Sequence, residues 1–134
     1  MKLLLIISFF ITISNATIVE SYLNNLKLEV LKEEPNFKGF DTKRGEEIFT
    51  SKHIGKRGKE ISCTSCHGID LSQNGKNFFT GKEIEPLSPK TNSKRLTSVK
   101  EIEKWLKRNF NDVYNRVGTN KEKGDVITYI LSKD

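Results

Sequence analysis

Residues 61–68, with the sequence ISCTSCHG, contain both cysteines of the chain and one of its two histidines. Cys63 and Cys66 are separated by two residues, and His67 follows directly. Three chemistries use thiols at this spacing: a redox-active dithiol, part of a zinc site, or covalent attachment of haem. In the third, the two sulfurs reach the vinyl groups along one edge of the porphyrin, and the histidine ligates the iron from below.

The first two chemistries find little support elsewhere in the chain. A structural zinc site needs four ligands, but there is no third cysteine and the only other histidine is His53. A thioredoxin-like dithiol is expected in a βαβ context, and strand signals are nearly absent here. Because C-x-x-C-H is the attachment signature of c-type haem, we predict one haem c bound through Cys63 and Cys66, with His67 as the proximal ligand.

The N-terminal residues 1–16 are typical of a secretory signal peptide. Lys2 gives a positive start, residues 3–13 are apolar, and small residues up to Ala16 offer a cleavage site. The apolar run is too short to span a bilayer comfortably, so an uncleaved anchor is the weaker interpretation. We therefore predict export to the periplasm, with cleavage near Ala16.

The mature chain is predicted to be all-α, with four helices and one long loop. Apolar residues at helical spacing run up to Pro35, which indicates an N-terminal helical extension over residues 17–40. Three further helices are expected from their N-terminal capping residues: Asp41 or Thr42, a Ser98–Glu101 capping box for a helix that ends near Gly118, and a Thr119–Glu122 capping box. Residues 69–96 form the loop. The hydrophobic content is only 35%, and small domains with thin cores usually need a metal or a large cofactor.

The chain carries 23 Lys and Arg against 17 Asp and Glu, a formal net charge of +6. A modest basic excess suits docking to an acidic protein or a membrane face. Lys56, Arg57 and Lys59, just before the cysteine motif, are candidates for a basic rim around an exposed haem edge. No nucleic-acid partner is expected, because no basic run is interleaved with aromatics in a recognisable module.

The ligand on the distal face of the iron would determine what such a protein does. Electron-transfer cytochromes c commonly use methionine, but the only methionine is Met1, which would leave with the signal peptide. The remaining candidates are His53, an asparagine or lysine, or no ligand. Asn109 falls inside the broad apolar face of the predicted helix over residues 98–118, and Asn111 falls outside it. The face is formed by Ile102, Trp105, Leu106, Phe110, Val113, Tyr114 and Val117. A buried amide without a partner costs about 1–3 kcal/mol, so we expect Asn109 to bind a backbone carbonyl, a haem propionate or the iron.

The chain resembles the class I cytochromes c beyond its haem motif. Gly45 and Phe49 match the G-x-x-x-F pattern of the N-terminal helix in that family, and Tyr129 in DVITYIL matches the aromatic of the C-terminal helix. The segments GKEIEPLSP, W-x-x-R-N-x-N-D-V and EKGDVITYIL are similar to the oxygen-binding cytochromes of the sphaeroides haem protein (SHP) type. The resemblance implies a small class I cytochrome c-like helical domain over residues 41–134, wrapped around one covalent haem c.

In the SHP type, an asparagine ligates ferric iron and departs on reduction, which leaves ferrous haem open to oxygen or nitric oxide. Asn109 matches that position, and Trp105 is expected to line the pocket. The resemblance implies electron transfer and gas binding rather than enzymatic turnover, with a dihaem cytochrome c or a membrane cytochrome b as electron donor. Characterised members carry a disulfide beside the asparagine, whereas Phe110 and Gly118 occupy the corresponding positions here.

Two other functions stay open on the sequence. The first is a plain electron carrier that is six-coordinate in both oxidation states, with His53 or a lysine as distal ligand. The second is an exported thiol–disulfide protein without haem.

Overall fold

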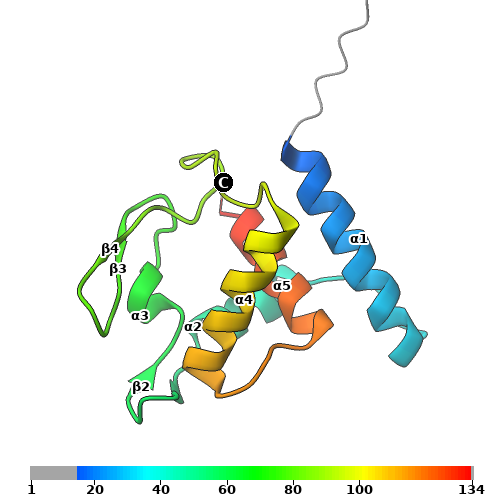
Figure 1. The fold of residues 1–134 in the computed structure, drawn as a ribbon. Coiled ribbons are helices and arrows are strands. Elements are labelled where there is room, and N and C mark those ends of the chain that lie inside the picture. The colour runs from blue at the N-terminus through cyan, green and yellow to red at the C-terminus, as the bar shows by residue number, and fades with distance from the viewer. Residues whose placement is uncertain (1–14, 134) are drawn as a thin grey trace, which may run out of the picture.

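The computed structural model describes residues 15–133 and consists mostly of helices arranged around α5 (Figure 1). In chain order the elements are α1 (Asn15–Glu33), α2 (Thr42–Thr50), β1 (His53–Ile54), β2 (Glu60–Ile61), α3 (Thr64–His67), β3 (Gly75–Lys76), β4 (Glu83–Ile84), α4 (Val99–Tyr114) and α5 (Asn120–Leu131). The signal peptide predicted for residues 1–16 lies outside the described residues except for its last two. None of the helices within residues 15–133 is both long and apolar enough to cross a membrane.

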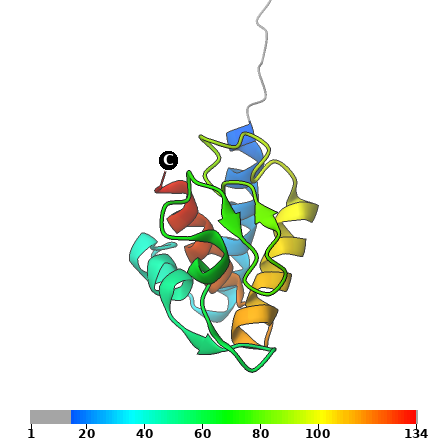
Figure 2. The same ribbon diagram turned by 90° about the vertical axis from the view of Figure 1, so that its left-hand side faces the viewer.

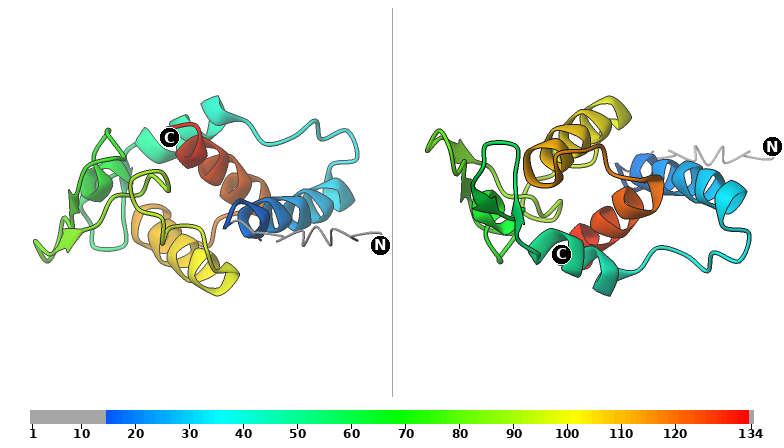
Figure 3. Two further views of the ribbon diagram at one scale, coloured as in Figure 1. Left: turned by 90° about the horizontal axis from the view of Figure 1, so that it is seen from above. Right: turned by 90° about the horizontal axis from the view of Figure 1, so that it is seen from below.

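The core lies between α1, α2, α4 and α5, and α5 packs chiefly against α2 and α1. Seen from above and from below, α1 lies on one side of α5, while α3 and the β3–β4 hairpin lie on the other (Figure 3). The buried side chains that form this core are Val19, Tyr22, Leu26, Phe49, Leu71, Ile102, Leu106, Phe110, Val126, Ile127, Tyr129 and Ile130. The all-α prediction is confirmed, and the cysteine motif lies on the face of α5 away from α1.

The crossing of α2 and α5 explains the Gly45 and Phe49 pattern. A Cβ on Gly45 would overlap the backbone carbonyl of Asp125 and lie 2.8 Å from the Cβ of Tyr129, so only glycine permits this approach. The Phe49 and Tyr129 rings pack beside it with centroids 5.3 Å apart. The resemblance to the helix crossing of class I cytochromes c is therefore present in three dimensions.

Capping sets most of the helix boundaries. Asp41 accepts a hydrogen bond from the Arg44 amide at the start of α2, and Thr119 with Glu122 forms the predicted capping box of α5. Ser98 caps α4 by accepting from the Glu101 amide, while the Glu101 carboxylate accepts from the Trp105 indole instead of closing the box.

The predicted end of the third long helix near Gly118 is wrong by four residues. The helix ends at Tyr114, because Asn115 adopts a left-handed conformation with φ 57°. Val117, which the helical pattern placed on the apolar face, is consequently outside the helix and 54% exposed.

Short strands and one extra helix complete the fold. Strands β1 and β2 form an antiparallel hairpin just before the cysteine motif, and β3 and β4 form a second one just after it. The second hairpin lies within the loop predicted for residues 69–96. The motif itself forms the single helical turn α3, so the described part of the chain has five helices where four were predicted.

Candidate functional site

The cysteine motif is held on one turn of helix. The amides of Cys66 and His67 both donate to the carbonyl of Cys63, at 3.2 and 3.0 Å, and Gly68 ends the turn with φ 71°. Residues three apart in a helix lie on the same face, so this turn presents the two sulfurs together. Both cysteines are free thiols in this structure.

Burial controls the ionisation of both ends of the motif. Burial raises the pKa of the Cys63 thiol to about 12, and the neighbouring Cys66 adds to the shift. Burial also lowers the pKa of His67 to about 4, with a further contribution from the positive charge of Arg95. The His67 imidazole is therefore neutral at pH 7, which is the form that coordinates metal. A thiol with a raised pKa is a poor nucleophile, so this burial does not favour Cys63 as the attacking thiol of a redox dithiol.

The β3–β4 hairpin packs directly on this turn (Figure 2). A Cβ on Gly75 would overlap the carbonyl oxygen of Cys66 and lie 3.1 Å from the Cα of His67, so the strand approaches as closely as a backbone can. The amide of Phe78 donates to the sulfur of Cys66 at 3.3 Å. On the core side, the Phe49 ring lies 6.1 Å from the His67 ring.

The loop beside His67 contains one residue that the sequence did not indicate. Arg95 donates to the carbonyls of Glu85 and Pro86, at 2.7 and 2.9 Å, and its charge is close enough to affect His67. These contacts join positions ten residues apart across an irregular loop. Local sequence patterns carry no signal for such contacts.

Asn109 lies on α4, among side chains that pack into the core. Its neighbours Ile102, Leu106, Phe110 and Val113 are buried, as the helical pattern predicted. Asn109 itself is half-buried, and its side-chain amide makes no hydrogen bond to any residue in the range 15–133. Such an amide is available to an external partner.

Trp105 lies one turn before Asn109 and is 39% exposed. Its indole nitrogen donates to Glu101 at 3.2 Å, and the cationic groups of Lys104 and Arg108 lie over its ring at 5.2 and 5.3 Å. Its place on the same helix face as Asn109 agrees with a pocket role, which stays a prediction.

His53 lies on β1 and pairs with Ile61 of β2. Ile61 is two residues before Cys63. The His53 ring packs against that of Tyr114 at an interplanar angle of 39°, with centroids 4.2 Å apart. The Nε2 atom of His53 is buried and has no hydrogen-bond partner among the described residues. His53 is thus adjacent to the attachment motif.

Phe110 and Gly118, the positions at which the resemblance to the SHP type implies a disulfide, are in direct contact. A Cβ on Gly118 would lie 2.7–2.8 Å from three atoms of the Phe110 ring, so the ring packs flat against the glycine backbone. In this chain an aromatic–glycine contact therefore connects α4 with the segment that leads into α5.

These residues fit a covalent haem. The free thiols project from one face of a helical turn, the adjacent imidazole is neutral, and the half-buried amide of Asn109 on α4 makes no hydrogen bond within residues 15–133. No group of three or more metal-ligating side chains that could hold an ion occurs within residues 15–133, which does not support the zinc interpretation.

Comparison with known proteins identifies the family. The family described as "Domain of unknown function (DUF1924)" matches residues 35–130. The cytochrome c-type protein SHP of Cereibacter sphaeroides is 40% identical over 93 residues, which cover 69% of this chain and 71% of SHP. This chain belongs to the DUF1924 family of monohaem c-type cytochromes.

Solved structures of two similar cytochromes share the fold of this cytochrome. The crystal structure of oxidized cytochrome c'' from Methylophilus methylotrophus superposes with a TM-score of 0.79 at 30% identity, covering 88% of this chain and 96% of that one. The structure of oxidized SHP, an oxygen-binding cytochrome c, gives a TM-score of 0.70 at 35% identity and covers 89% and 96% of the two chains. A solution structure of cytochrome c'', which addresses haem-ligand detachment, gives 0.76 at 31% identity, with 87% and 94% covered.

Family membership confirms the predicted cofactor. With the C-x-x-C pair of Cys63 and Cys66, the cytochrome carries one covalent haem c, as its relatives do. The haem-free thiol–disulfide interpretation is therefore wrong.

Proposed function

We propose that this cytochrome is a periplasmic electron-transfer protein whose distal haem site is closed by Asn109 in the ferric state and opens on reduction. Cys63 and Cys66 would hold the haem, and His67 would ligate it from the proximal side. The haem supplies the one-electron chemistry and, where its distal position is free, the affinity for oxygen or nitric oxide.

The observation that carries the proposal is the place of Asn109 on the face of α4 that holds the buried Leu106, Phe110 and Val113. The amide is half-buried and makes no hydrogen bond within residues 15–133, so it can bind a further group without first breaking a bond to the protein. An amide oxygen is a hard, weak donor that suits ferric better than ferrous iron, so Asn109 would be released on reduction. Met1, the sole methionine, falls within the predicted signal peptide and gives the mature chain no thioether ligand.

The relatives support a distal site that can open. SHP binds oxygen, and cytochrome c'' undergoes haem-ligand detachment. A protein related to both is expected to combine a displaceable ligand with access for a small gas.

The test is to replace Asn109 with alanine and record the absorption spectrum of the ferric holoprotein. Loss of the ligand should shift the spectrum from a low-spin to a high-spin form. Asn111→Ala is a matched control, because Asn111 is the same residue type on the same helix, outside the predicted apolar face. A ferric spectrum of Asn109→Ala identical to that of the wild type would reject Asn109 as ligand.

A second candidate, the six-coordinate carrier, is favoured by one observation. The buried Nε2 of His53 has no partner among the described residues, so this imidazole is also available as a ligand. His53→Ala separates the two functions, since it should change the ferric spectrum only if His53 occupies the distal position.

We infer that the redox partner docks on the basic turn of the β1–β2 hairpin. Lys56, Arg57 and Lys59 are exposed there, and Arg57 packs over the Phe79 ring at 4.3 Å, next to the loop that contacts Cys66. Such a surface suits an acidic partner, and the family resemblance suggests a dihaem cytochrome c or a membrane cytochrome b. Replacing Lys56 and Lys59 by Glu should slow reduction by the partner most strongly at low salt, and equal slowing at all salt concentrations would contradict this surface.

A further inference from the structure

The β1–β2 hairpin lies against the C-terminal end of α4, far along the chain from it (Figure 2). Asn115 ends α4 in the left-handed conformation, so the last carbonyls of the helix lack partners within the helix. The hairpin supplies one of these partners. The amide of Lys56 donates to the carbonyl of Asp112 at 3.0 Å.

Three further contacts hold the same junction. The side-chain amide of Asn115 donates to the carbonyl of Ile54 at 3.0 Å. A Cβ on Gly55 would overlap the carbonyl oxygen of Asp112 and lie 2.9 Å from the Ile61 side chain, so the two backbones meet without space between them. The rings of His53 and Tyr114 pack against each other along one side of the junction.

The other strand of the hairpin leads directly to the haem attachment. Strand β2 ends at Ile61, and the buried Ser62 precedes Cys63. The Ser62 hydroxyl lies 2.6 Å from that of Thr64, and the amide of Ser62 donates to the Ser65 hydroxyl at 3.0 Å. The segment between the hairpin and the cysteines is therefore fixed by its own hydrogen bonds.

Asn109 lies three residues before Asp112, within one helical turn of the junction. A shift of this end of α4 relative to the hairpin would change the position of Asn109 relative to the cysteine attachment. Ligand bonds need accurate placement, since supporting contacts outside the ligands strongly affect affinity.

We propose that the β1–β2 hairpin fixes Asn109 over the haem by holding the end of α4, and that Asn115 is the positioning residue of this junction. The proposal rests on ligation by Asn109. The junction thus sets how readily Asn109 leaves the distal site, although none of its hydrogen-bonding groups belongs to a haem ligand.

The test is imidazole binding to the ferric holoprotein, followed by absorption. Imidazole competes with Asn109 for the distal site, so looser placement of Asn109 raises its apparent affinity. Asn115→Gly is the cleanest variant, because glycine accepts a φ of 57° while the bond to Ile54 is lost. Loss of one ordinary hydrogen bond corresponds to an increase of about fivefold in apparent affinity. Gly55→Ala, which forces the backbones apart, should act in the same direction.

Two controls separate positioning from general destabilisation. Lys121→Ala removes an ion pair with Glu34 at 2.7 Å on α5, without touching the hairpin or α4, and should leave the affinity unchanged. In an Asn109→Ala background the affinity should be high already, and adding Asn115→Gly should change nothing further.

The outcomes are distinct. The proposal is overturned if neither Asn115→Gly nor Gly55→Ala raises the affinity, or if Asn115→Gly acts equally with and without Asn109. If Asn109→Ala alone leaves both the ferric spectrum and the imidazole affinity unchanged, ligation by Asn109 is rejected, and the positioning role with it.

Discussion

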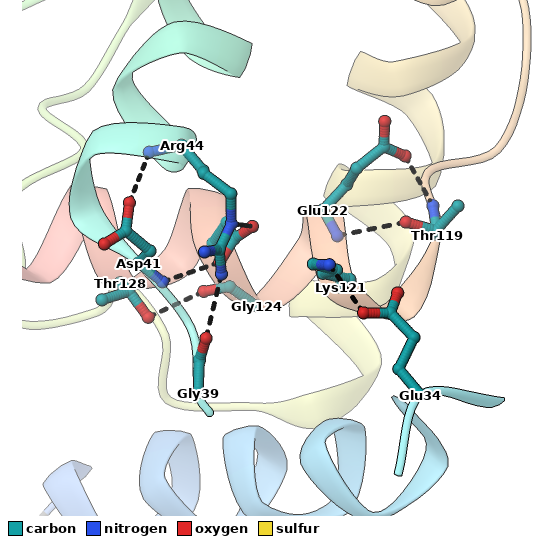
Figure 4. Close-up of polar contacts among 10 residues, drawn as sticks. Glu34, Gly39, Asp41, Arg44, Thr119, Lys121, Glu122, Gly124 and Thr128 are labelled. Atoms are coloured by element: carbon teal, nitrogen blue, oxygen red, sulfur yellow. Dashed lines mark hydrogen bonds and ion pairs between the residues drawn. The ribbon is translucent and has the colours of Figure 1, made fainter. Parts of the chain in front are cut away.

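Replacing Arg44 by alanine would leave a buried carboxylate without its cationic partner at the crossing of α2 and α5. Arg44 donates from Nε and Nη2 to the two oxygens of Asp125, at 2.8 and 2.9 Å. The amide of Asp41 donates to the same carboxylate at 2.7 Å, and Arg44 also binds the carbonyl of Gly39. Figure 4 shows this group of contacts around Arg44.

The size of the effect follows from the burial of the two partners. The Asp125 side chain is 2% exposed and that of Arg44 is 42% exposed. Breaking a buried pair by removing the partner of a buried charge costs about 3–5 kcal/mol, so we expect Arg44→Ala to lower the free energy of unfolding by about 4 kcal/mol. Lys32→Ala is the matched control. Its pair with Glu29 is shorter, 2.6 Å, but both side chains are more than half exposed, and such pairs contribute at most about 1 kcal/mol.

Urea denaturation of the ferric holoprotein, followed by far-UV circular dichroism, measures both variants. Adding Asp125→Asn to Arg44→Ala should restore about 1–2 kcal/mol, because the neutral amide removes the uncompensated charge. A loss below about 1 kcal/mol for Arg44→Ala, or no recovery in the double variant, would refute this reasoning.

Two further predictions concern the connection between α4 and α5. Gly118→Ala places a methyl group 2.7 Å from the Phe110 ring, so we expect a loss of about 1–3 kcal/mol in urea denaturation, and an unchanged stability would contradict the close packing. Hydrogen bonding from Arg116 lowers the pKa of Glu122 below its ordinary value of 4.5. The stabilisation by Glu122 is therefore complete above about pH 4.5 and is lost as the pH falls through the lowered pKa. The stability difference between the wild type and Glu122→Gln should accordingly shrink between pH 6 and pH 3, and a constant difference would argue against the ion pair.

Local sequence signals predicted much of the fold. Asp41 and Thr119 mark helix starts because a short polar side chain before an apolar stripe binds free backbone amides. Gly45 and Phe49 indicated a close helix crossing, and in the structure Gly45 lies directly against the backbone of α5 at Asp125. These features depend on residues within one or two helical turns.

Features that depend on distant contacts were not predictable. The end of α4 is set by Asn115, whose left-handed conformation is stabilised by a bond to Ile54, 61 residues earlier. Strands of two residues are too short to produce an alternating pattern, so neither hairpin was visible. Val117 continued the helical apolar pattern by spacing alone, without being in the helix.

The candidate site likewise contains residues that local sequence predicts and residues that only distant contacts bring together. The spacing of Cys63, Cys66 and His67 is local, and it predicted the cofactor. Asn109 was identified because a polar residue inside an apolar face is unusual, and the structure leaves its amide without a partner in residues 15–133. Arg95 and the hairpin contact to α4 were missed, because both arise from packing between distant segments.

The central claim is that reduction opens the distal site. Absorption and resonance Raman spectra of the wild-type holoprotein in both oxidation states, with carbon monoxide added after reduction, test it most directly. We predict six-coordinate low-spin ferric haem and five-coordinate ferrous haem that binds carbon monoxide at once. Ferrous haem that stays six-coordinate and does not respond to carbon monoxide would contradict the account.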